Sequence, residues 1–295
     1  MTATIQVIVV LYQRSFEQSE SLSSLFAILR ERPEWAQRLS LLVYDNSPHA
    51  QVPSDKVPVP VTYIHDSGNS GLAKAYNAAL ARAEQEKCEW LLLLDQDTSL
   101  NAEFVSELLE VATRVQEQLS VGAIVPKLMV GGTMHSPARE FFVELRRIRK
   151  PGKSIYLQAS GMQQQHLVAY NSGSALRVSA LRAIGGFPAE FWLDFLDHAV
   201  FHKLYQHGYR LYILNARLAH DFSDSNVASV AAWRQLNVLE ARNLYVKQNG
   251  SAIDRLLYRI WLLRRARSLR RSGADPQVWR STAFAAFWLA RKHKR

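Results

Sequence analysis

The uncharged apolar run Trp90–Leu94, which two carboxylates follow at once, constrains the fold of this chain more than any other segment. A short apolar run between polar residues predicts a strand buried on both faces of a parallel sheet. Asp95 and Asp97 then lie at the carboxyl end of that strand, where open α/β sheets bind ligands. Their oxygens suit Mg²⁺ or Mn²⁺. The alternative is a helix N-cap, because Asp97, Thr98 and Ser99 all cap helices well.

Strands and helices alternate along the first part of the chain. Apolar β-branched or leucine-rich runs predict strands at Thr4–Leu11, Leu41–Tyr44 and Val61–Ile64. Between them, apolar spacing predicts a helix from Ser15 or Ser19 to about Leu29, which Pro33 stops, and an alanine-rich helix from Gly71 to near Lys87. This order predicts right-handed βαβ units and a mostly parallel sheet flanked by helices, the α/β class.

Later elements are shorter and less regular. We expect helices at Asn101–Leu119, Val178–Ile184 and Asp197–His207, and strands at Val121–Val125 (ended by Pro126), His166–Ser172, Arg210–Leu214 and Ala216–His220. For residues 131–165 we expect hairpins and a loop. Beyond Asn226 the pattern is helical, with helices expected at Val227–Asn249, Ala252–Arg271 and Pro276–Ala290. The chain therefore predicts a domain over residues 1–225 and a basic helical region over 226–295.

The positive charge is concentrated in the last part of the chain. The net charge is +10, yet residues 242–295 hold 14 Lys or Arg and 2 Asp or Glu, so the remainder is nearly neutral. Such asymmetry predicts a polyanionic partner. The helix Ala252–Arg271 places Trp261, Leu262 and Leu263 beside many arginines, which favours a helix lying on an anionic membrane. A helical cap on the rest of the protein and a dimer interface are the alternatives.

Other sequence features narrow the class of protein. A single cysteine, Cys88, excludes an internal disulfide framework and suits a reducing cytosol. The N-terminus predicts a first strand and no signal peptide, and no run is long enough to span a bilayer. Nothing resembles a nucleic-acid reading helix or stacking sheet, so no nucleic-acid partner is expected. The glycine turn before the alanine-rich helix matches neither a dinucleotide fingerprint nor a P-loop, although helix N-termini favour anions.

The motifs taken together resemble a known family. In chain order they are the strand ending at Leu11-Tyr12, Asp45-Asn-Ser, Asn69-Ser-Gly-Leu-Ala-Lys-Ala-Tyr-Asn, Asp95-Gln-Asp-Thr, Ser172-Gly-Ser, Ile184-Gly-Gly-Phe, the aromatic segment before Asp197, Gly208-Tyr-Arg and His220. Over residues 4–222 this order is similar to the family 2 inverting glycosyltransferases of the GT-A fold. Two segments look most like those of the bacterial rhamnosyltransferases that build polysaccharides. They are Asp95-Gln-Asp-Thr and Phe191-Trp-Leu-Asp-Phe-Leu-Asp.

The resemblance implies a role for each matched residue. The nucleotide base and ribose would lie at Leu11, Tyr12 and Asp45, and the diphosphate along Asn69, Gly71 and Lys74. Asp95 would lie near the sugar or ribose, Asp97 at the metal, and Asp197 would be the catalytic base, with His220 as a further metal ligand. Three alternatives stay open: Asp194 as the base, Lys74 as a solvated lysine, and His220 as a histidine hydrogen-bonded to the core.

The implied activity is metal-dependent transfer of a sugar from a nucleotide diphosphate donor to a glycan or lipid-linked glycan hydroxyl. L-Rhamnose from dTDP-rhamnose is the expected donor, in cell-surface polysaccharide or lipopolysaccharide biosynthesis. UDP donors of galactofuranose, galactose or glucose are alternatives. A nucleotidyltransferase is less favoured, because Leu11–Ser15 offers no glycine-rich basic signature. The expected location is the cytoplasm, with peripheral attachment to the inner face of the plasma membrane and homo-oligomerisation as open options.

Overall fold

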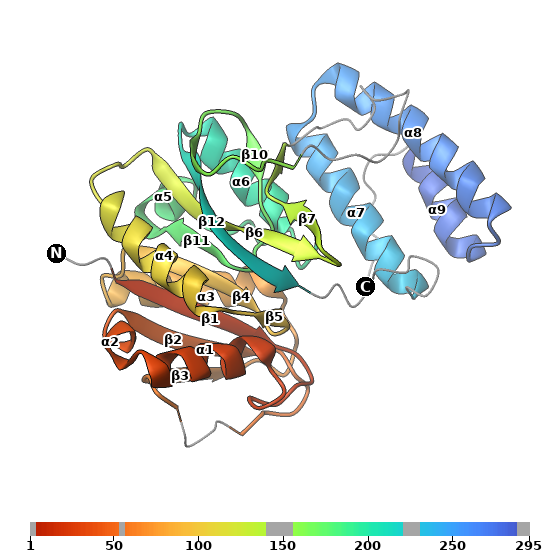
Figure 1. Cartoon of the computed structure of the whole chain (residues 1–295). Helices are drawn as coiled ribbons and strands as arrows, with labels where there is room; N and C mark the ends of the chain where they lie inside the picture. The colour runs from red at the N-terminus through yellow and green to blue at the C-terminus, as the bar shows by residue number, and fades with distance from the viewer. Residues whose placement is uncertain (1–3, 53–56, 140–155, 221–230, 288–295) are drawn as a thin grey trace. The chain divides into compact units, whose positions relative to one another are not determined.

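The computed structural model describes residues 4–52, 57–139, 156–220 and 231–287, which fall into two compact units (Figure 1). The described residues up to 220 form an α/β unit, and residues 231–287 form a helical unit. The α/β class, a mixed and mostly parallel sheet flanked by helices, and the C-terminal helices are confirmed. The predicted boundary at residues 225 and 226 lies outside the described residues.

Four parallel strands form the first half of the sheet, as the alternation of strands and helices predicts. They are β1 (Ile5–Leu11), β2 (Leu39–Asp45), β3 (Val61–His65) and β4 (Trp90–Asp95), in the order β3-β2-β1-β4. Leu11 pairs with Asp45, and Val10 pairs with Asp95. The carboxyl ends of three neighbouring strands therefore meet at one edge.

The second half of the sheet mixes strand directions. It continues through β11 (Ser174–Arg177), β6 (Val121–Val130), β12 (Arg210–His220) and β5 (Thr98–Ser99), with β7 (Thr133–Ser136) on β6 and β9 (Gly161–Gln163) on β12. Strands β6 and β12 are parallel, whereas β11 runs antiparallel to both β4 and β6. A separate pair is formed by β8 (Ala138–Arg139) and β10 (Leu167–Val168).

Helices cover both faces of this sheet (Figure 1). They are α1 (Glu20–Glu31), α2 (Pro33–Ala36), α3 (Leu72–Gln85), α4 (Ala102–Arg114), α5 (Val178–Ala183) and α6 (Leu196–Gln206). Alternate residues of β1, from Ile5 to Leu11, share one buried cluster with the apolar stripes of α1 and α4. Helix α3 packs against β1 and β4 with buried small residues such as Ala75 and Ala79. These small side chains let α3 lie close to the strand ends that form the site.

Three predicted bounds are wrong. Pro126 does not end its strand, because β6 runs on to Val130 and Pro126 lies at a register irregularity between β6 and β12, where the ladder does not need its missing N–H. The expected strand 166–172 is reduced to β10 and a turn. Helix α4 ends at Arg114 instead of Leu119 because the buried Arg177 guanidinium binds the carbonyls of residues 115, 116 and 118.

The helical unit contains α7 (Ala232–Asn249), α8 (Ala252–Arg271) and α9 (Pro276–Ala285). Its small core joins Val246, Tyr258 and Leu262 to Ala285 and Ala286. The bounds of α8 match the prediction, α9 is shorter than expected, and the predicted start of α7 at Val227 lies outside the described residues. Among the helices that the structure describes, none is long and apolar enough to cross a membrane.

Candidate active site

The loops after β1, β2 and β4 are tied together at the carboxyl edge of the sheet. The backbone N–H of Tyr12 donates to Gln96 Oε1 at 2.9 Å, and the N–H of Gln13 donates to Ser47 Oγ at 2.8 Å. The Tyr12 side chain is 43% exposed, so it stays accessible beside these bonds. The three loops therefore form one fixed rim, which contains the predicted residues Leu11, Tyr12, Asp45 and Asp95.

Asp45 organises the loop that follows β2. Its buried carboxylate accepts hydrogen bonds from the Tyr63 hydroxyl at 2.6 Å and from the backbone N–H groups of Ser47 and Gln51, each at 2.9 Å. Burial by itself would raise the pKa of Asp45, but these hydrogen bonds outweigh it and lower the pKa below its ordinary value. Asp45 is therefore ionised at neutral pH. Its contact with a nucleotide base or ribose stays a prediction.

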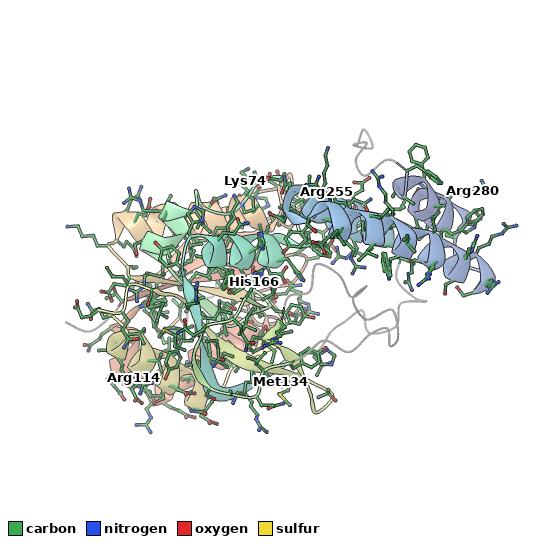
Figure 2. All side chains as sticks on the ribbon, turned by 90° about the horizontal axis from the view of Figure 1, so that it is seen from above. Lys74, Arg114, Met134, His166, Arg255 and Arg280 are labelled. Carbon is green, nitrogen blue, oxygen red and sulfur yellow. The ribbon has the colours of Figure 1, made fainter. Side chains whose placement is uncertain are left out.

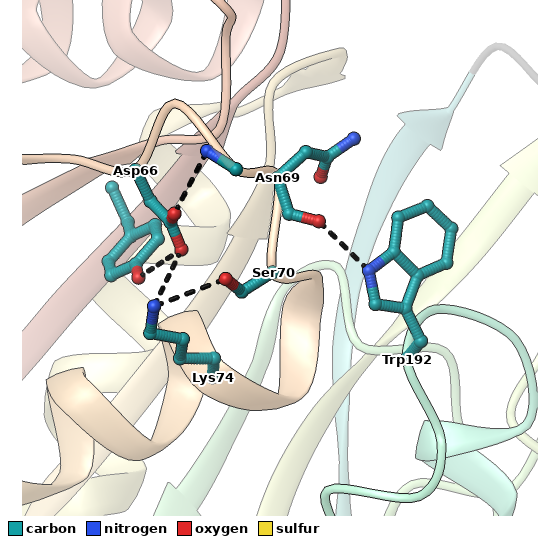
Figure 3. Close-up of polar contacts among 7 residues, drawn as sticks. Asp66, Asn69, Ser70, Lys74 and Trp192 are labelled. Carbon is teal, nitrogen blue, oxygen red and sulfur yellow. Dashed lines mark hydrogen bonds and ion pairs between the residues drawn. The ribbon is translucent and has the colours of Figure 1, made fainter. Parts of the chain in front are cut away.

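Lys74 lies in a polar network at the start of α3 (Figure 3). Its Nζ atom donates to Asp66 Oδ2 at 3.0 Å and to Ser70 Oγ at 3.1 Å, and the Tyr44 hydroxyl donates to the same Asp66 oxygen at 2.9 Å. Burial alone would raise the pKa of Asp66, but the bonds from Ser70, Lys74 and Tyr44 hold it well below its usual range. The Lys74 side chain is still 59% exposed. Lys74 is therefore a paired cation that remains accessible to an anionic ligand.

Gly71 lets the segment before α6 approach the start of α3. A Cβ atom at Gly71 would lie 2.3 Å from Trp192 Cδ1, and the backbone φ of 88° lies in the left-handed region. Trp192 Nε1 donates to the Asn69 carbonyl at 3.0 Å (Figure 3). The Leu72 N–H donates to the Trp192 carbonyl at 2.9 Å. The Asn69–Gly71 turn thus seats Trp192, and only glycine fits there.

Two further residues of α3 hold the same segment; they end the motif that begins at Asn69, but the sequence assigned them no role. The Asn77 amide donates to the Phe187 carbonyl at 2.8 Å and accepts from the Phe187 N–H at 3.0 Å. The rings of Tyr76 and Phe187 lie 5.1 Å apart. The available signal was an asparagine and a tyrosine on an otherwise alanine-rich helix. Together with Trp192, these contacts fix the chain between α5 and α6 against α3 and the turn that precedes it.

The Asp95–Asp97 turn connects β4 to β5. Ser172 Oγ accepts from the Asp95 N–H at 3.3 Å and contacts the Thr98 hydroxyl. Asp97 is half-buried, and within the described residues its carboxylate has no hydrogen-bond or ion-pair partner. The helix-cap alternative for Asp97 is wrong, because the next helix, α4, is capped by Asn101, whose Oδ1 accepts from the Phe104 N–H at 2.8 Å.

The oxygen chemistry of this turn fits a divalent cation. His220 pairs with Thr98 in the β12–β5 ladder, which places its backbone one residue from Asp97, but its side chain lies outside the described part of the structure. The described residues contain no group of three His, Cys, Asp or Glu side chains that could hold a metal. Mg²⁺ is commonly held by one or two carboxylates together with substrate phosphates. An accessible Asp97 that has no partner within the described residues fits that arrangement.

Asp197 lies in the first turn of α6, as predicted. Helix α6 follows Phe195, whose φ of 60° is left-handed. One carboxylate oxygen of Asp197, Oδ1, accepts from the His198 N–H at 2.8 Å and contacts His198 Nδ1 at 2.9 Å. The Asp197 side chain is 14% exposed. Asp194 lies in the irregular segment before α6. Asp197 is therefore held in place at the start of the helix.

Asp95 and Asp197 lie around the same phenol. Tyr76 is fully buried, and burial, followed by the charges of Asp95 and Asp197, raises its pKa well above the ordinary value. Burial and the charge of Asp197 also raise the pKa of Tyr170 to about 12. Both phenols are therefore neutral at physiological pH. The fold brings the carboxylate at the end of β4 and the carboxylate at the start of α6 to one place, although they are far apart in sequence.

Two comparisons relate the chain to known proteins. The model of the family described as glycosyl transferase family 2 matches residues 7–185. No curated protein matches. The crystal structure of S. aureus TarS is similar with a TM-score of 0.51 and 16% identity, over 88% of this chain and 43% of that chain. The crystal structure of S. aureus TarS 1-349 in complex with UDP-GlcNAc is also similar, with a TM-score of 0.51 and 16% identity. The match covers 96% of this chain and 79% of that chain.

The two kinds of comparison support different conclusions. The chain spans less than half the length of the first TarS chain, and at 16% identity the likeness shows the GT-A-like fold alone. The family model, in contrast, covers more than half of this chain and includes the β1, Asp45, Asn69–Lys74 and Asp95–Asp97 segments. The chain therefore belongs to glycosyltransferase family 2.

Proposed function

We propose that this glycosyltransferase is a metal-dependent, inverting enzyme that transfers a sugar from a nucleotide diphosphate donor to a hydroxyl of a glycan or lipid-linked glycan. The observation that carries the proposal is that the charges of Asp95 and Asp197 both act on the buried Tyr76 phenol. It supports a site in which a donor-side carboxylate and a carboxylate at a helix start face one reaction centre. Inverting displacement needs a single base on the acceptor side, which distinguishes the site from the carboxylate pair of a hydrolase.

Each residue then has a defined task. Asp45, with Leu11 and Tyr12, binds the base and ribose, and Asn69, Gly71 and Lys74 line the diphosphate path. Asp97, with His220 as a second candidate, would hold the metal. A divalent metal, which family 2 enzymes commonly use, would neutralise charge on the diphosphate leaving group. Asp97 is suited to this role because its carboxylate has no partner within the described residues.

Asp197 acts at the acceptor. It takes the proton of the acceptor hydroxyl while the acceptor oxygen bonds to the anomeric carbon and the bond from that carbon to the diphosphate breaks. The attack comes from the face opposite the leaving group, so the configuration inverts. The position of Asp197 in the first turn of α6 favours its anion through the helix dipole. Asp194 is the alternative base.

The donor in this proposal is dTDP-rhamnose, which the Asp95-Gln-Asp-Thr motif and the aromatic segment before Asp197 support through their resemblance to rhamnosyltransferases. UDP donors of galactofuranose, galactose or glucose are the alternatives. The process would be cell-surface polysaccharide biosynthesis, including lipopolysaccharide. The enzyme would act in the cytoplasm, with its basic helices on an anionic membrane face. A homo-oligomer remains an open part of the proposal.

A thermal-shift screen of the full-length chain tests this function. dTDP-rhamnose, UDP-galactose and UDP-glucose are each added with and without Mn²⁺. A donor at about 100 times its Kd stabilises the folded state by about 2.7 kcal/mol, and we expect one sugar nucleotide to do so only with the metal. Stabilisation by nucleoside triphosphates alone, with pyrophosphate release, would indicate a nucleotidyltransferase. The absence of any shift with sugar nucleotides would contradict the proposal.

A further inference from the structure

Helix α8 carries two apolar faces. Tyr258, Leu262, Ala266 and Leu269 are buried within the helical unit. A second set stays exposed: Ile253 (66%), Leu256 (59%), Ile260 (38%) and Leu263 (39%). Residues spaced by three or four positions lie on the same side of a helix, so these four form a continuous stripe, which we call the α8 stripe.

The structure corrects the face that the sequence predicts. Leu262 is fully buried, and Trp261 packs against the core of the helical unit, where its ring stacks on Tyr258 at 5.5 Å. Of the expected Trp261-Leu262-Leu263 face, only Leu263 belongs to the exposed stripe. On α8, the apolar residues that stay accessible to a partner are therefore those of the α8 stripe.

Arginines surround the α8 stripe. With about 3.6 residues per turn, Arg259 and Arg264 border it on opposite sides, and Arg267 and Arg271 continue it beyond Leu263. All four are exposed. Figure 2 shows the side chains along α8, with Arg255 labelled, and Arg280 on α9. The helix contains seven arginines and a single acid, Asp254. An exposed apolar stripe thus lies within a strongly basic surface.

We propose that the α8 stripe inserts into the interface of an anionic lipid bilayer, with α8 lying parallel to the membrane plane. Aliphatic side chains on one face and flanking arginines are the features of helices that lie in this interface. The bordering arginines reach anionic headgroups while the four aliphatic side chains enter the acyl boundary. Because no described helix can span a membrane, attachment through α8 is peripheral.

Two other partners fit the α8 stripe less well. A second copy of this chain would pair the stripe with itself, and a two-fold interface would then place arginines against arginines. A nucleic acid would satisfy the arginines, but it would leave the aliphatic side chains in water, since single-stranded nucleic acid is held by stacking on aromatic rings. An anionic bilayer matches both the charge and the apolar surface.

Vesicle sedimentation of the full-length chain tests the inference. It rests on the membrane part of the proposed function alone, and no donor or acceptor is added. The protein should sediment with vesicles of phosphatidylglycerol and phosphatidylcholine, but not with phosphatidylcholine alone. Leu256→Asn combined with Ile260→Asn should lower the partition coefficient roughly tenfold or more. The matched control, Leu119→Asn with Met162→Asn, changes two exposed apolar residues elsewhere and should leave it unchanged.

Arg259→Gln with Arg264→Gln should weaken binding at low salt and reduce its salt dependence. The inference is overturned if the wild-type chain does not bind anionic vesicles. It is also overturned if the variant with Leu256→Asn and Ile260→Asn, the stripe variant, binds them as strongly as the wild type does. A change in oligomeric state of the stripe variant without loss of vesicle binding would assign the stripe to a second copy. Donor-dependent thermal shifts are measured separately, so failure of sugar transfer and failure of membrane binding are distinguishable.

Discussion

His198 fixes one oxygen of Asp197. Its backbone N–H and its Nδ1 atom lie 2.8 and 2.9 Å from Asp197 Oδ1. Because an ionised carboxylate can only accept hydrogen bonds, Nδ1 must be the donor. The imidazole also packs on the Phe195 ring, with centroids 4.7 Å apart. Both contacts use the same carboxylate oxygen, so in the proposed mechanism Oδ2 would take the proton of the acceptor hydroxyl.

His198→Ala should therefore reduce kcat with little change in KM for the donor. Losing one hydrogen bond to a charged group is worth about 1.5–3 kcal/mol, and we expect a loss of roughly tenfold or more. His198→Asn, which offers an N–H near the Nδ1 position, should recover most activity. An unchanged kcat in His198→Ala would assign the imidazole a packing role only.

Gly71→Ala should destabilise the α/β unit and raise KM for the donor, because the new Cβ would collide with Trp192. Overpacking typically costs about 1–3 kcal/mol, in addition to about 1–2 kcal/mol for the left-handed backbone. Gly161→Ala is the matched control, since Gly161 has the same φ of 88° but no atom within 4 Å of the added Cβ. The midpoint of urea unfolding measures the stability of each variant. Equal losses in the two variants would show that Trp192 accommodates the methyl group.

The Asp66 network should make stability depend on acid pH. The pKa of Asp66 is held below its unfolded value of about 3.9, so its anion stabilises the fold at neutral pH, and this contribution is lost as the pH falls below about 4. Asp66→Asn should lower the urea midpoint at pH 7, and the difference from the wild type should narrow towards pH 3. The exposed acid Glu103 gives a control, Glu103→Gln. A difference in urea midpoint between Asp66→Asn and the wild type that stays constant with pH would contradict the lowered pKa of Asp66.

Asp97→Ala should remove the metal dependence of transfer. Its carboxylate has no partner within the described residues, so the substitution leaves no buried group unsatisfied. We expect activity to fall by at least about 100-fold, the range found when an electrostatic contact to the leaving charge is lost, and Mn²⁺ to give no stimulation. Initial rates at increasing Mn²⁺ check this, with Glu103→Ala as the control. Full, metal-dependent transfer by Asp97→Ala would place the metal elsewhere.

Much of the first half of the fold is predictable because its signals are local. The strand Trp90–Asp95 is a continuous apolar run, and α1 begins where Ser19 caps it and accepts from the Leu22 N–H at 3.3 Å. The same holds for the acids, since Asp45 and Asp95 end the two parallel strands that flank β1. The sequence thus predicts that these residues share one edge of the sheet.

Other features depend on contacts that no local pattern encodes. Strand β11 has only four residues and lies antiparallel between β4 and β6. From its sequence pattern, so short a run cannot be distinguished from the first turn of the helix that follows it. The packing of Trp192 on Gly71 joins segments distant in sequence. On α8, two apolar faces both have helical spacing, so the sequence cannot select the buried one.

The most direct test of the catalytic assignment compares Asp197→Asn with Asp194→Asn. Each change removes one negative charge and keeps the side-chain shape. Donor binding is measured by calorimetry with Mn²⁺, and transfer is measured by release of the nucleoside diphosphate in the presence of acceptor. We predict that Asp197→Asn binds the donor nearly as the wild type does and loses transfer by about 100-fold or more, while Asp194→Asn retains it. Normal turnover by Asp197→Asn, with loss in Asp194→Asn, would contradict the account and assign the base to Asp194.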